Sequence, residues 1–280
     1  MTPKYIEFGN PHDWEIFLQR HPVFAEKMQA IFGTFEKIFL RELQSETSAD
    51  RVIFYLGRIC IEDFMEILLL CGNGHGIGGL KLLRGLYERA VTLAYIAKYP
   101  EMADKFLGYH AIHKWRLFNH ASKVLDMKKL LPSDEIESIK KSYEETKENY
   151  QEVLCEKCGK KRVRISWSNL DLASMASKVG LEKQYMQCYF QPTLQSHPTV
   201  SSLTQRLKVR SDGHIGFESG PQQEQIDFAL NGAHFMILSV IDDENRYFKM
   251  NLDEEIQDRF KDYVEIVKKS ERIACPKDAG

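Results

Sequence analysis

Apolar side chains recur every three or four positions along most of this chain, which is the spacing of helices that bury one face. Residues 23–43 follow this spacing, while residues 51–71 and 80–99 are apolar on nearly every side. A helix that is apolar all round is usually enclosed by other elements. The pattern therefore predicts a helical core with residues 51–71 and 80–99 at its centre.

The remaining segments extend this to an all-α fold of roughly nine helices. Further helices are predicted over residues 13–19, 101–125, 133–154, 222–242 and 252–273, with short ones within 170–189. Residues 72–79 are rich in glycine and predict a connector between the two central helices. Glycine-rich loops can also bind phosphate, but this one lacks the Walker lysine that such a loop needs.

Two segments do not have a helical pattern. Residues 155–168 carry alternating apolar positions and predict a small Cys-x-x-Cys loop or hairpin insertion, and residues 191–217 read as irregular. We expect one bundle-like domain over residues 46–250, with N-terminal helices in residues 1–45 and a C-terminal helix and tail in residues 251–280.

Composition narrows the class of protein. The 17 glycines and 9 prolines among 280 residues are too few for a turn-rich all-β fold, and a net charge of -2 is unlike that of a globally basic nucleic-acid binder. No apolar run approaches the ~20 residues of a membrane helix, and residues 1–14 lack a signal-peptide core. Six scattered cysteines indicate a reducing compartment. We expect a cytoplasmic protein without a membrane partner.

A charged pair interrupts the second central helix. Arg84 and Glu88 are four positions apart, so they share one helical face with the apolar residues Leu80, Val91 and Tyr95. Burying such a pair is costly. It is therefore either a structural salt bridge or part of a functional pocket.

A second polar group lies further along the chain, where Tyr189 is followed by Ser196 and His197. Histidine moves protons readily near neutral pH, and a loop residue is well placed to enter a pocket. Ser196 and His197 are adjacent, so their side chains diverge and do not form a nucleophile–base pair by themselves. The alternative is a histidine that only hydrogen-bonds the backbone.

Cys155 and Cys158 supply half of a zinc ribbon or knuckle. The other ligands would come from Cys188, Cys275, a histidine or the same pair of a second subunit. Free thiols and a redox disulfide are the alternatives, and the βαβ context of a thioredoxin-like motif is absent.

A further metal site is conceivable at His110 and His113, which are three positions apart on one predicted helix. The carboxylates that neighbouring helices could add are those of Glu62, Asp63, Glu66 and Glu88. The paired Glu-x-x-His pattern of di-iron bundles is absent. This hypothesis describes a metal-dependent helical-bundle enzyme.

The Cys-x-x-Cys insertion also holds the densest basic cluster of the chain. It consists of Lys157, Lys160, Lys161, Arg162 and Arg164, and Trp167 follows. Cations hold a phosphate backbone and an indole stacks on a base, so the cluster predicts an RNA-binding arm. The alternative is a solvated loop.

Several motifs follow one another along the chain: LLRGLYERAVTLAYI, a helix rich in tyrosine and histidine, Trp167, and then Tyr189 to His197. This order resembles that of the bacterial family described as domain of unknown function 5677. The resemblance covers about residues 53–242. It implies a helical bacterial protein with its polar residues at Arg84, Glu88, Tyr189 and His197, and with residues 155–164 as an insertion. It implies no settled activity.

A weaker similarity is to the helical HEPN ribonucleases of toxin and phage-defence systems, whose motif is Arg, four to six residues and then His. Arg116 and His120 are separated by three residues, as are Arg210 and His214. Arg206 and His214 are separated by seven. None of these spacings matches the motif.

Two functions fit the residues Arg84, Glu88, Tyr189 and His197. In the first, they line a polar pocket of a ligand- or partner-binding protein, which could act as a homodimer. In the second, they form a metal-independent ribonuclease, a toxin-like or phage-defence effector in which His197 moves a proton and Arg84, oriented by Glu88, neutralises charge on phosphate. An exposed His197 would favour the second function, and a buried, saturated one the first.

Overall fold

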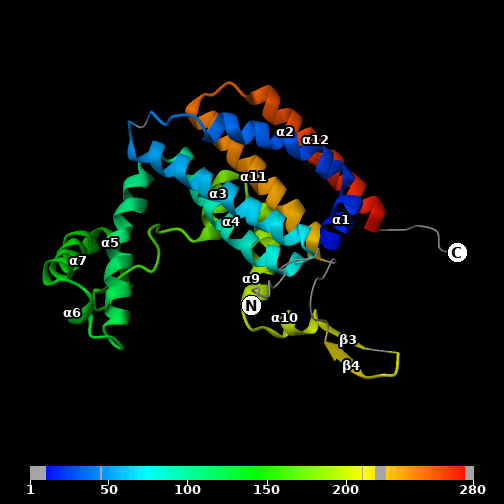
Figure 1. The fold of residues 1–280 in the computed structure, drawn as a ribbon. Helices are drawn as coiled ribbons and strands as arrows, with labels where there is room; N and C mark the ends of the chain where they lie inside the picture. Colours follow the sequence, from blue (N-terminus) through cyan, green and yellow to red (C-terminus); the bar gives the residue numbers. More distant parts are fainter. Residues whose placement is uncertain (1–10, 45, 210, 218–224, 275–280) are drawn as a thin grey trace, which may run out of the picture.

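A computed structural model describes residues 11–44, 46–209, 211–217 and 225–274 (Figure 1). These residues confirm an all-α fold, with twelve α-helices and two small antiparallel sheets. The long helices are α1 (Pro11–Arg20), α2 (Pro22–Phe39), α3 (Ser48–Gly72), α4 (Gly76–Lys98), α5 (Met102–Ala121), α7 (Ser133–Thr146), α11 (Ile226–Phe248) and α12 (Asp253–Ala274). The short ones are α6 (Met127–Leu130), α8 (Leu172–Val179), α9 (Gln191–Ser196) and α10 (Val200–Thr204). The strands are β1 (Gln151–Cys155), β2 (Lys160–Val163), β3 (Leu207–Val209) and β4 (Ile215–Phe217).

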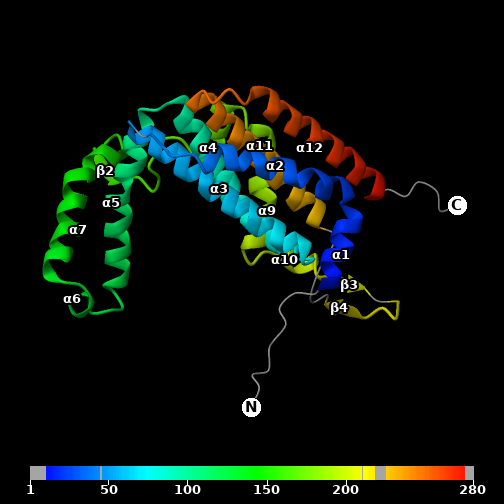
Figure 2. The same cartoon turned by 45° about the horizontal axis from the view of Figure 1, so that its top comes forward.

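Helices α3, α4 and α11 pack against one another at the centre, and α2 and α12 cover one side of them (Figures 1 and 2). The close approach of these helices where they cross depends on glycine. A Cβ at Gly232 of α11 would lie 2.8 Å from Cδ2 of Leu83 on α4, and one at Gly57 of α3 would overlap Phe39 and Glu244. A larger residue at either position would force the helices apart. Within the described ranges, no helix combines the length and apolar character needed to cross a bilayer.

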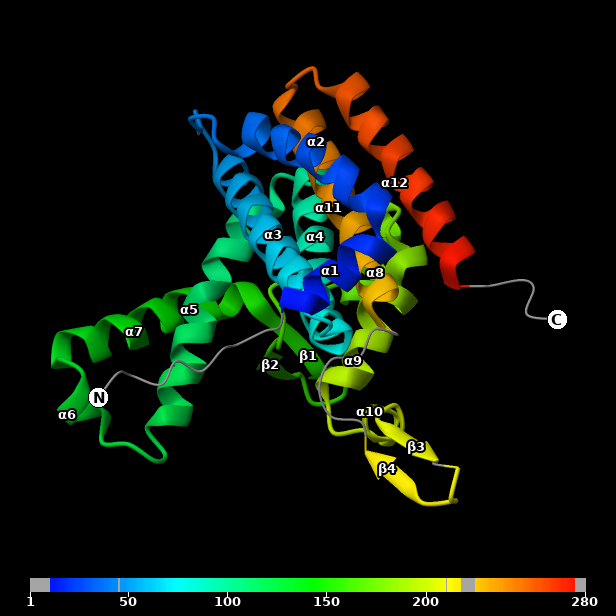
Figure 3. The same ribbon diagram turned by 45° about the vertical axis from the view of Figure 1, so that its right-hand side comes forward.

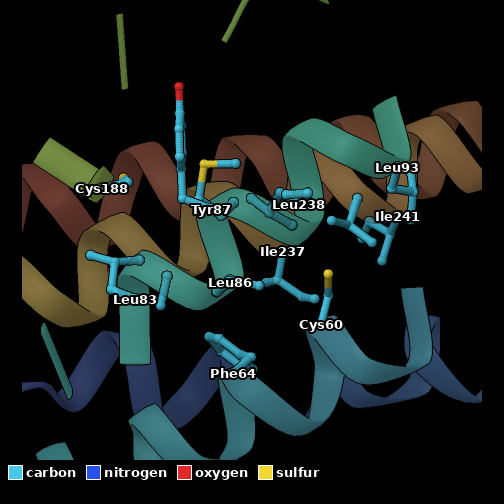
Figure 4. Close-up of a cluster of buried hydrophobic side chains, with 14 of the residues drawn as sticks. Cys60, Phe64, Leu83, Leu86, Tyr87, Leu93, Cys188, Ile237, Leu238 and Ile241 are labelled. Atoms are coloured by element: carbon cyan, nitrogen blue, oxygen red, sulfur yellow. The ribbon is translucent and has the colours of Figure 1, made fainter. Parts of the chain in front are cut away.

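The core lies where these central helices meet, and Figure 4 shows its middle. Leu86 of α4 lies beside Ile237 of α11 and above Phe64 of α3 in this view, and these three side chains, like that of Leu83 on α4, are fully buried. Each such side chain contributes about 1.5–3 kcal/mol by leaving water. Residues from α1, α2, α8 and α12 join the same cluster, so these helices extend one core.

Helix α3 differs from the prediction that it is enclosed on all sides. It packs on α4 and α11, but Tyr55, Ile59, Met65 and Leu69 on its opposite face are exposed. Periodicity reports which residues are apolar and not which of them are covered, so the sequence could not separate a central helix from one with an apolar outer face.

The glycine-rich connector is shorter than predicted. Helix α3 ends at Gly72 and α4 begins at Gly76, so Gly78 and Gly79 lie inside a helix. A Cβ on Gly79 would lie 3.1 Å from the Cys71 sulfur and 3.3 Å from Cβ of Ala229. These glycines therefore serve close helix packing rather than a flexible loop.

Helices α5, α6 and α7 form an arm that projects from the body (Figures 1 and 2). The predicted helix over 133–154 ends at Thr146, because the chain turns through a 3-10 helix into β1, which pairs with β2. This confirms the hairpin expected in the Cys-x-x-Cys segment. Arg116 of α5 ties the hairpin to the arm by donating to the carbonyl of Arg164 at 2.6 Å.

Residues 191–217 are more ordered than the prediction of an irregular segment. They contain α9, α10 and the hairpin β3–β4, which Figure 3 shows extending from the body. Thr199 begins α10 with a capping box, in which its hydroxyl accepts from the Ser202 N–H and the Ser202 hydroxyl accepts from the Thr199 N–H. Serine and threonine, which we interpreted as loop residues, act here as helix caps. The short α6, α9 and α10 account for the excess over nine helices.

Candidate functional site

The side chain of Arg84 joins the two polar groups that the sequence singled out. Its Nε donates to Oε1 of Glu88 at 3.0 Å, and its Nη1 lies 3.3 Å from Nε2 of His197. Its guanidinium carbon lies 5.2 Å from the centre of the Tyr189 ring, which is within the range of a cation–π contact. We call Arg84, Glu88, Tyr189 and His197 the Arg84 cluster. The structure thus brings together all four predicted residues, from α4 and from the chain around α9.

Tyr189 owes its position to a π-helical turn, Met186–Phe190, that runs into α9. The N–H of Gln191 donates to the carbonyl of Met186, five positions earlier. Pro192 explains this turn, because proline has no N–H and its ring clashes with a carbonyl four positions earlier. The wider turn directs Tyr189 towards α4, where its ring lies 6.1 Å from that of Tyr87.

Tyr87 fixes the same region and was not singled out from the sequence. Its buried phenol donates to the carbonyl of Leu181 at 3.0 Å, and its ring lies 6.2 Å from that of Tyr185. The sequence signal for Tyr87 was its position next to Glu88 on an apolar helix. A tyrosine buried there needs a hydrogen-bond partner for its hydroxyl.

His197 follows the last residue of α9 and is held by its backbone. Its N–H donates to the Thr193 carbonyl at 3.2 Å, and its own carbonyl accepts from the Thr199 N–H at 2.8 Å. The hydroxyl of Ser196 is engaged with the Pro192 carbonyl at 3.0 Å, so it is not paired with His197. The imidazole itself is exposed, whereas the other three members of the Arg84 cluster are partly buried.

Electrostatics keep Arg84 charged. Partial burial opposes its charge, but the hydrogen bond to Glu88 and the nearby Glu88 and Tyr189 side chains outweigh burial and raise its pKa above the usual value. An arginine N–H can only donate, so Nε2 of His197 accepts in this contact and the ring proton sits on Nδ1. The cluster therefore presents a fixed cation beside an exposed imidazole, a combination suited to a phosphate group.

The basic hairpin is only partly as predicted. Lys157, Lys160 and Lys161 are exposed, and Arg162 forms an ion pair with Glu152 across the hairpin. Within the part of the chain that the structure describes, no hydrogen bond or ion pair links these residues to the Arg84 cluster.

The last two residues of the predicted RNA-binding set point inward. Arg164 donates to the carbonyl of Asn149 at 3.3 Å and lies over the Tyr150 ring. The Trp167 ring is partly buried, edge-on to Phe106 at a centroid distance of 5.4 Å. These contacts leave the three lysines and Arg162 as the exposed basic surface.

The Cys-x-x-Cys pair lies at the turn of the β1–β2 hairpin as free thiols. Hydrogen bonds from the backbone and thiol of Cys158, and from the Lys157 N–H, lower the pKa of Cys155. Cys188 is buried in the core near Gly232, and Cys275 lies outside the described residues. No group of three metal-ligating side chains occurs among the residues described, so zinc at this pair would need ligands from elsewhere.

His110 and His113 line a hollow of about 270 Å³ on α5, together with Phe106, Tyr109 and Trp167. Burial, followed by the charges of Arg116 and His110, lowers the pKa of His113. None of the carboxylates proposed as partners lines this hollow.

The arginine–histidine pairs compared with the HEPN motif do not meet in contacts of the described chain. Arg116 donates to the Tyr109 hydroxyl, Arg206 lies over the Phe217 ring, and Arg210 lies outside the described residues. These positions therefore add no site to the Arg84 cluster.

The fold and the cluster define an all-α protein with a surface arginine–histidine site on α4 and α9. The model of the Family of unknown function (DUF5677) matches residues 50–215, which is more than half of the chain, and the chain belongs to this family. The match runs through the β1–β2 hairpin and ends before α11, short of the limit near residue 242 that the resemblance implied. No curated protein and no solved structure matches the chain. The similarity to the HEPN ribonucleases is not confirmed.

Proposed function

We propose that this chain is a metal-independent ribonuclease that cleaves RNA at the Arg84 cluster. The observation that carries the proposal is the exposed imidazole of His197, with Nε2 held 3.3 Å from the guanidinium of a charged arginine. A structural histidine would be buried with both nitrogens satisfied. Because the cluster faces solvent, it suits a phosphodiester in an extended chain better than a small ligand, which needs an enclosing cavity.

The chemistry follows from the groups in place. A phosphate oxygen of RNA replaces Nε2 of His197 as the acceptor for Arg84, which frees Nε2 to take the proton of the 2′-hydroxyl. The 2′-oxygen bonds to phosphorus and the bond to the 5′-oxygen breaks, leaving a 2′,3′-cyclic phosphate. Arg84 neutralises the charge that develops on the phosphoryl oxygens, and Glu88 holds Arg84. Water protonates the leaving 5′-oxygen, and the hydroxide that remains takes the proton back from Nε2 of His197.

A second candidate is a protein that binds a phosphate-bearing ligand or partner without cleaving it. It is favoured by the presence of a single histidine in the cluster, since efficient ribonucleases of this type use both an acid and a base. Glu88 is engaged with Arg84 and does not supply the second group.

Cleavage of total RNA in excess EDTA tests the proposal, with wild type beside His197→Ala and Arg84→Ala. Each variant should lower the rate by about 10²-fold or more. His120→Ala is the matched control, because His120 is also an exposed histidine and should cleave like the wild type.

Binding of an all-deoxy analogue, which lacks the 2′-hydroxyl, separates the two candidates. If wild type binds it, and Arg84→Ala does not, while neither cuts RNA, the ribonuclease is refuted and the binding protein stands. If wild type neither binds nor cuts, both proposals fail.

A further inference from the structure

Helix α3 leaves one face uncovered for about five turns. Figures 1 and 3 show α3 on the outside of the central helices, with α4 and α11 on its inner side. The exposed positions repeat at intervals of three and four, so they form one stripe. They are Arg51, Tyr55, Arg58, Ile59, Glu62, Met65, Glu66 and Leu69, and we call this stripe the α3 face.

Half of the α3 face is apolar. Tyr55, Ile59, Met65 and Leu69 are between 39% and 58% exposed. Single exposed apolar side chains are ordinary on protein surfaces, but four along one helix form a continuous patch. Such a patch is typical of a surface that another protein covers.

The charges of the α3 face are separated by sign along the helix. Arg51 and Arg58 lie in its N-terminal half, and Glu62 and Glu66 in its C-terminal half. None of the four forms an ion pair with another residue in the described ranges. The face is therefore neutral overall, with a basic end and an acidic end that lack partners.

We propose that the α3 face binds the α3 face of a second copy of this chain, with the two helices antiparallel. A two-fold dimer places the same surface of each subunit against the other, so the surface must complement itself. Antiparallel packing sets each basic half on the partner's acidic half, whereas parallel packing would oppose like charges.

In the proposed register residue 62 lies at the two-fold axis, because this centre sets opposite charges against each other and apolar side chains against apolar ones. Positions 58 and 66 are equally distant from position 62, which places Arg58 opposite Glu66 of the partner subunit. The same centre places Tyr55 opposite the partner's Leu69 and Ile59 opposite the partner's Met65. Glu62 lies near the two-fold axis, one helical turn from Arg58 on its own chain, so the two glutamates that meet there are flanked by arginine.

A groove beside the α3 face gives the partner's side chains somewhere to pack. It has a volume of about 210 Å³ and lies between α2 and α3. Phe35, Phe39 and Ile61 line it together with Arg58 and Glu62. The acidic half disfavours a nucleic acid or an anionic membrane as the occupant, because both would be repelled by Glu62 and Glu66.

Charge exchange at Arg58 and Glu66 tests the dimer, and the test does not depend on ribonuclease activity. Sedimentation velocity and light scattering from roughly 1 to 100 µM should show a wild-type dimer. Arg58→Glu and Glu66→Arg should each raise the dissociation constant at least about 10-fold. The combined variant should restore it, because the two charges exchange places across the axis. Leu69→Glu should give a monomer, while Leu117→Glu, at an exposed leucine on α5, should leave the dimer intact.

Three outcomes would overturn the proposal: a wild type that is monomeric throughout this range, a dimer that survives both Arg58→Glu and Leu69→Glu, or single variants whose defect the charge exchange does not repair. Circular dichroism of each variant confirms that α3, whose substituted residues are all exposed, remains folded.

Discussion

Nη1 of Arg84 lies 3.3 Å from Nε2 of His197, although 113 positions separate the two residues in sequence. Because the guanidinium donates, the imidazole accepts and the two side chains set each other's orientation. Glu88 holds the other side of the guanidinium at 3.0 Å. Removing either member of the pair therefore also displaces the other.

This coupling predicts non-additive effects of mutation. Arg84→Ala and His197→Ala should each slow RNA cleavage by about 10²-fold, and the double variant should be little slower than the worse single variant. The measurement is a double-mutant cycle on cleavage of a short labelled RNA. Strictly multiplicative losses would mean that the two side chains act independently and do not position each other before RNA binds.

Local sequence rules reached the first half of the Arg84 cluster but not its assembly. The spacing of Arg84 and Glu88 on a helix fixes their contact, since residues four apart lie on one face. Tyr189 and His197 were singled out as a polar group near a loop, but their approach to Arg84 depends on how α9 packs on α4. The π-helical turn before Pro192 sets that packing. Pro192 accounts for the turn locally, but the packing of α9 on α4 is a tertiary contact that no local pattern encodes.

The difference between local patterns and tertiary packing also explains where the predicted fold was wrong. The main helices were predicted because their apolar spacing is local. A hairpin was predicted from the alternation within residues 155–168, but most of its first strand, β1, had been assigned to the helix over 133–154. The hairpin β3–β4 was missed, since three-residue strands at Leu207–Val209 and Ile215–Phe217 are too short to show alternation. The outer face of α3 was missed because coverage depends on neighbouring elements.

The basic hairpin makes a second prediction, through Lys160 and Lys161, which are exposed and form no ion pair with a described residue. If they contact RNA phosphates, Lys160→Ala/Lys161→Ala should weaken binding of single-stranded RNA and reduce the slope of log K against log salt by about 1.4. Fluorescence anisotropy between low and moderate salt measures both quantities. Lys128→Ala/Lys129→Ala on the exposed α6 is the control, and equal effects of the two pairs would argue against a binding role for the hairpin.

Cys155 is predicted to be the most reactive described thiol. Hydrogen bonds from Cys158 and from the Lys157 N–H lower its pKa, whereas burial raises the pKa of Cys71 and Cys188 to about 12. Iodoacetamide at neutral pH should therefore label Cys155 first, because the thiolate is the nucleophile. Site-resolved mass spectrometry follows the rates. Cys158→Ser should change the rate at Cys155 and leave the buried thiols unlabelled; a rate at Cys155 no faster than at Cys158 would contradict the prediction.

Glu244 on α11 predicts how stability depends on pH. Its carboxyl is fully buried without a hydrogen bond, and Arg41, the nearest cation, lies 4.0 Å away between the Phe54 and Phe248 rings. Burial raises its pKa to about 8, although Arg41 opposes this, so the folded protein keeps the proton at neutral pH.

The sign of the effect follows from comparison with the unfolded chain, in which the same carboxyl has its ordinary pKa of 4.5. Between pH 4.5 and about 8 the folded state binds more protons than the unfolded state, so stability falls as pH rises through this range and then levels off. Glu244→Gln resembles the protonated acid, so its stability should not fall over this range. Its free energy of unfolding relative to that of wild type should therefore rise by roughly 3 kcal/mol between pH 5 and 8. Urea unfolding at several pH values measures the difference, with Glu137→Gln, at an exposed carboxylate, as the control. A difference between Glu244→Gln and wild type that stays constant with pH would show that Glu244 is ionised in the folded protein, held by Arg41 as an ion pair.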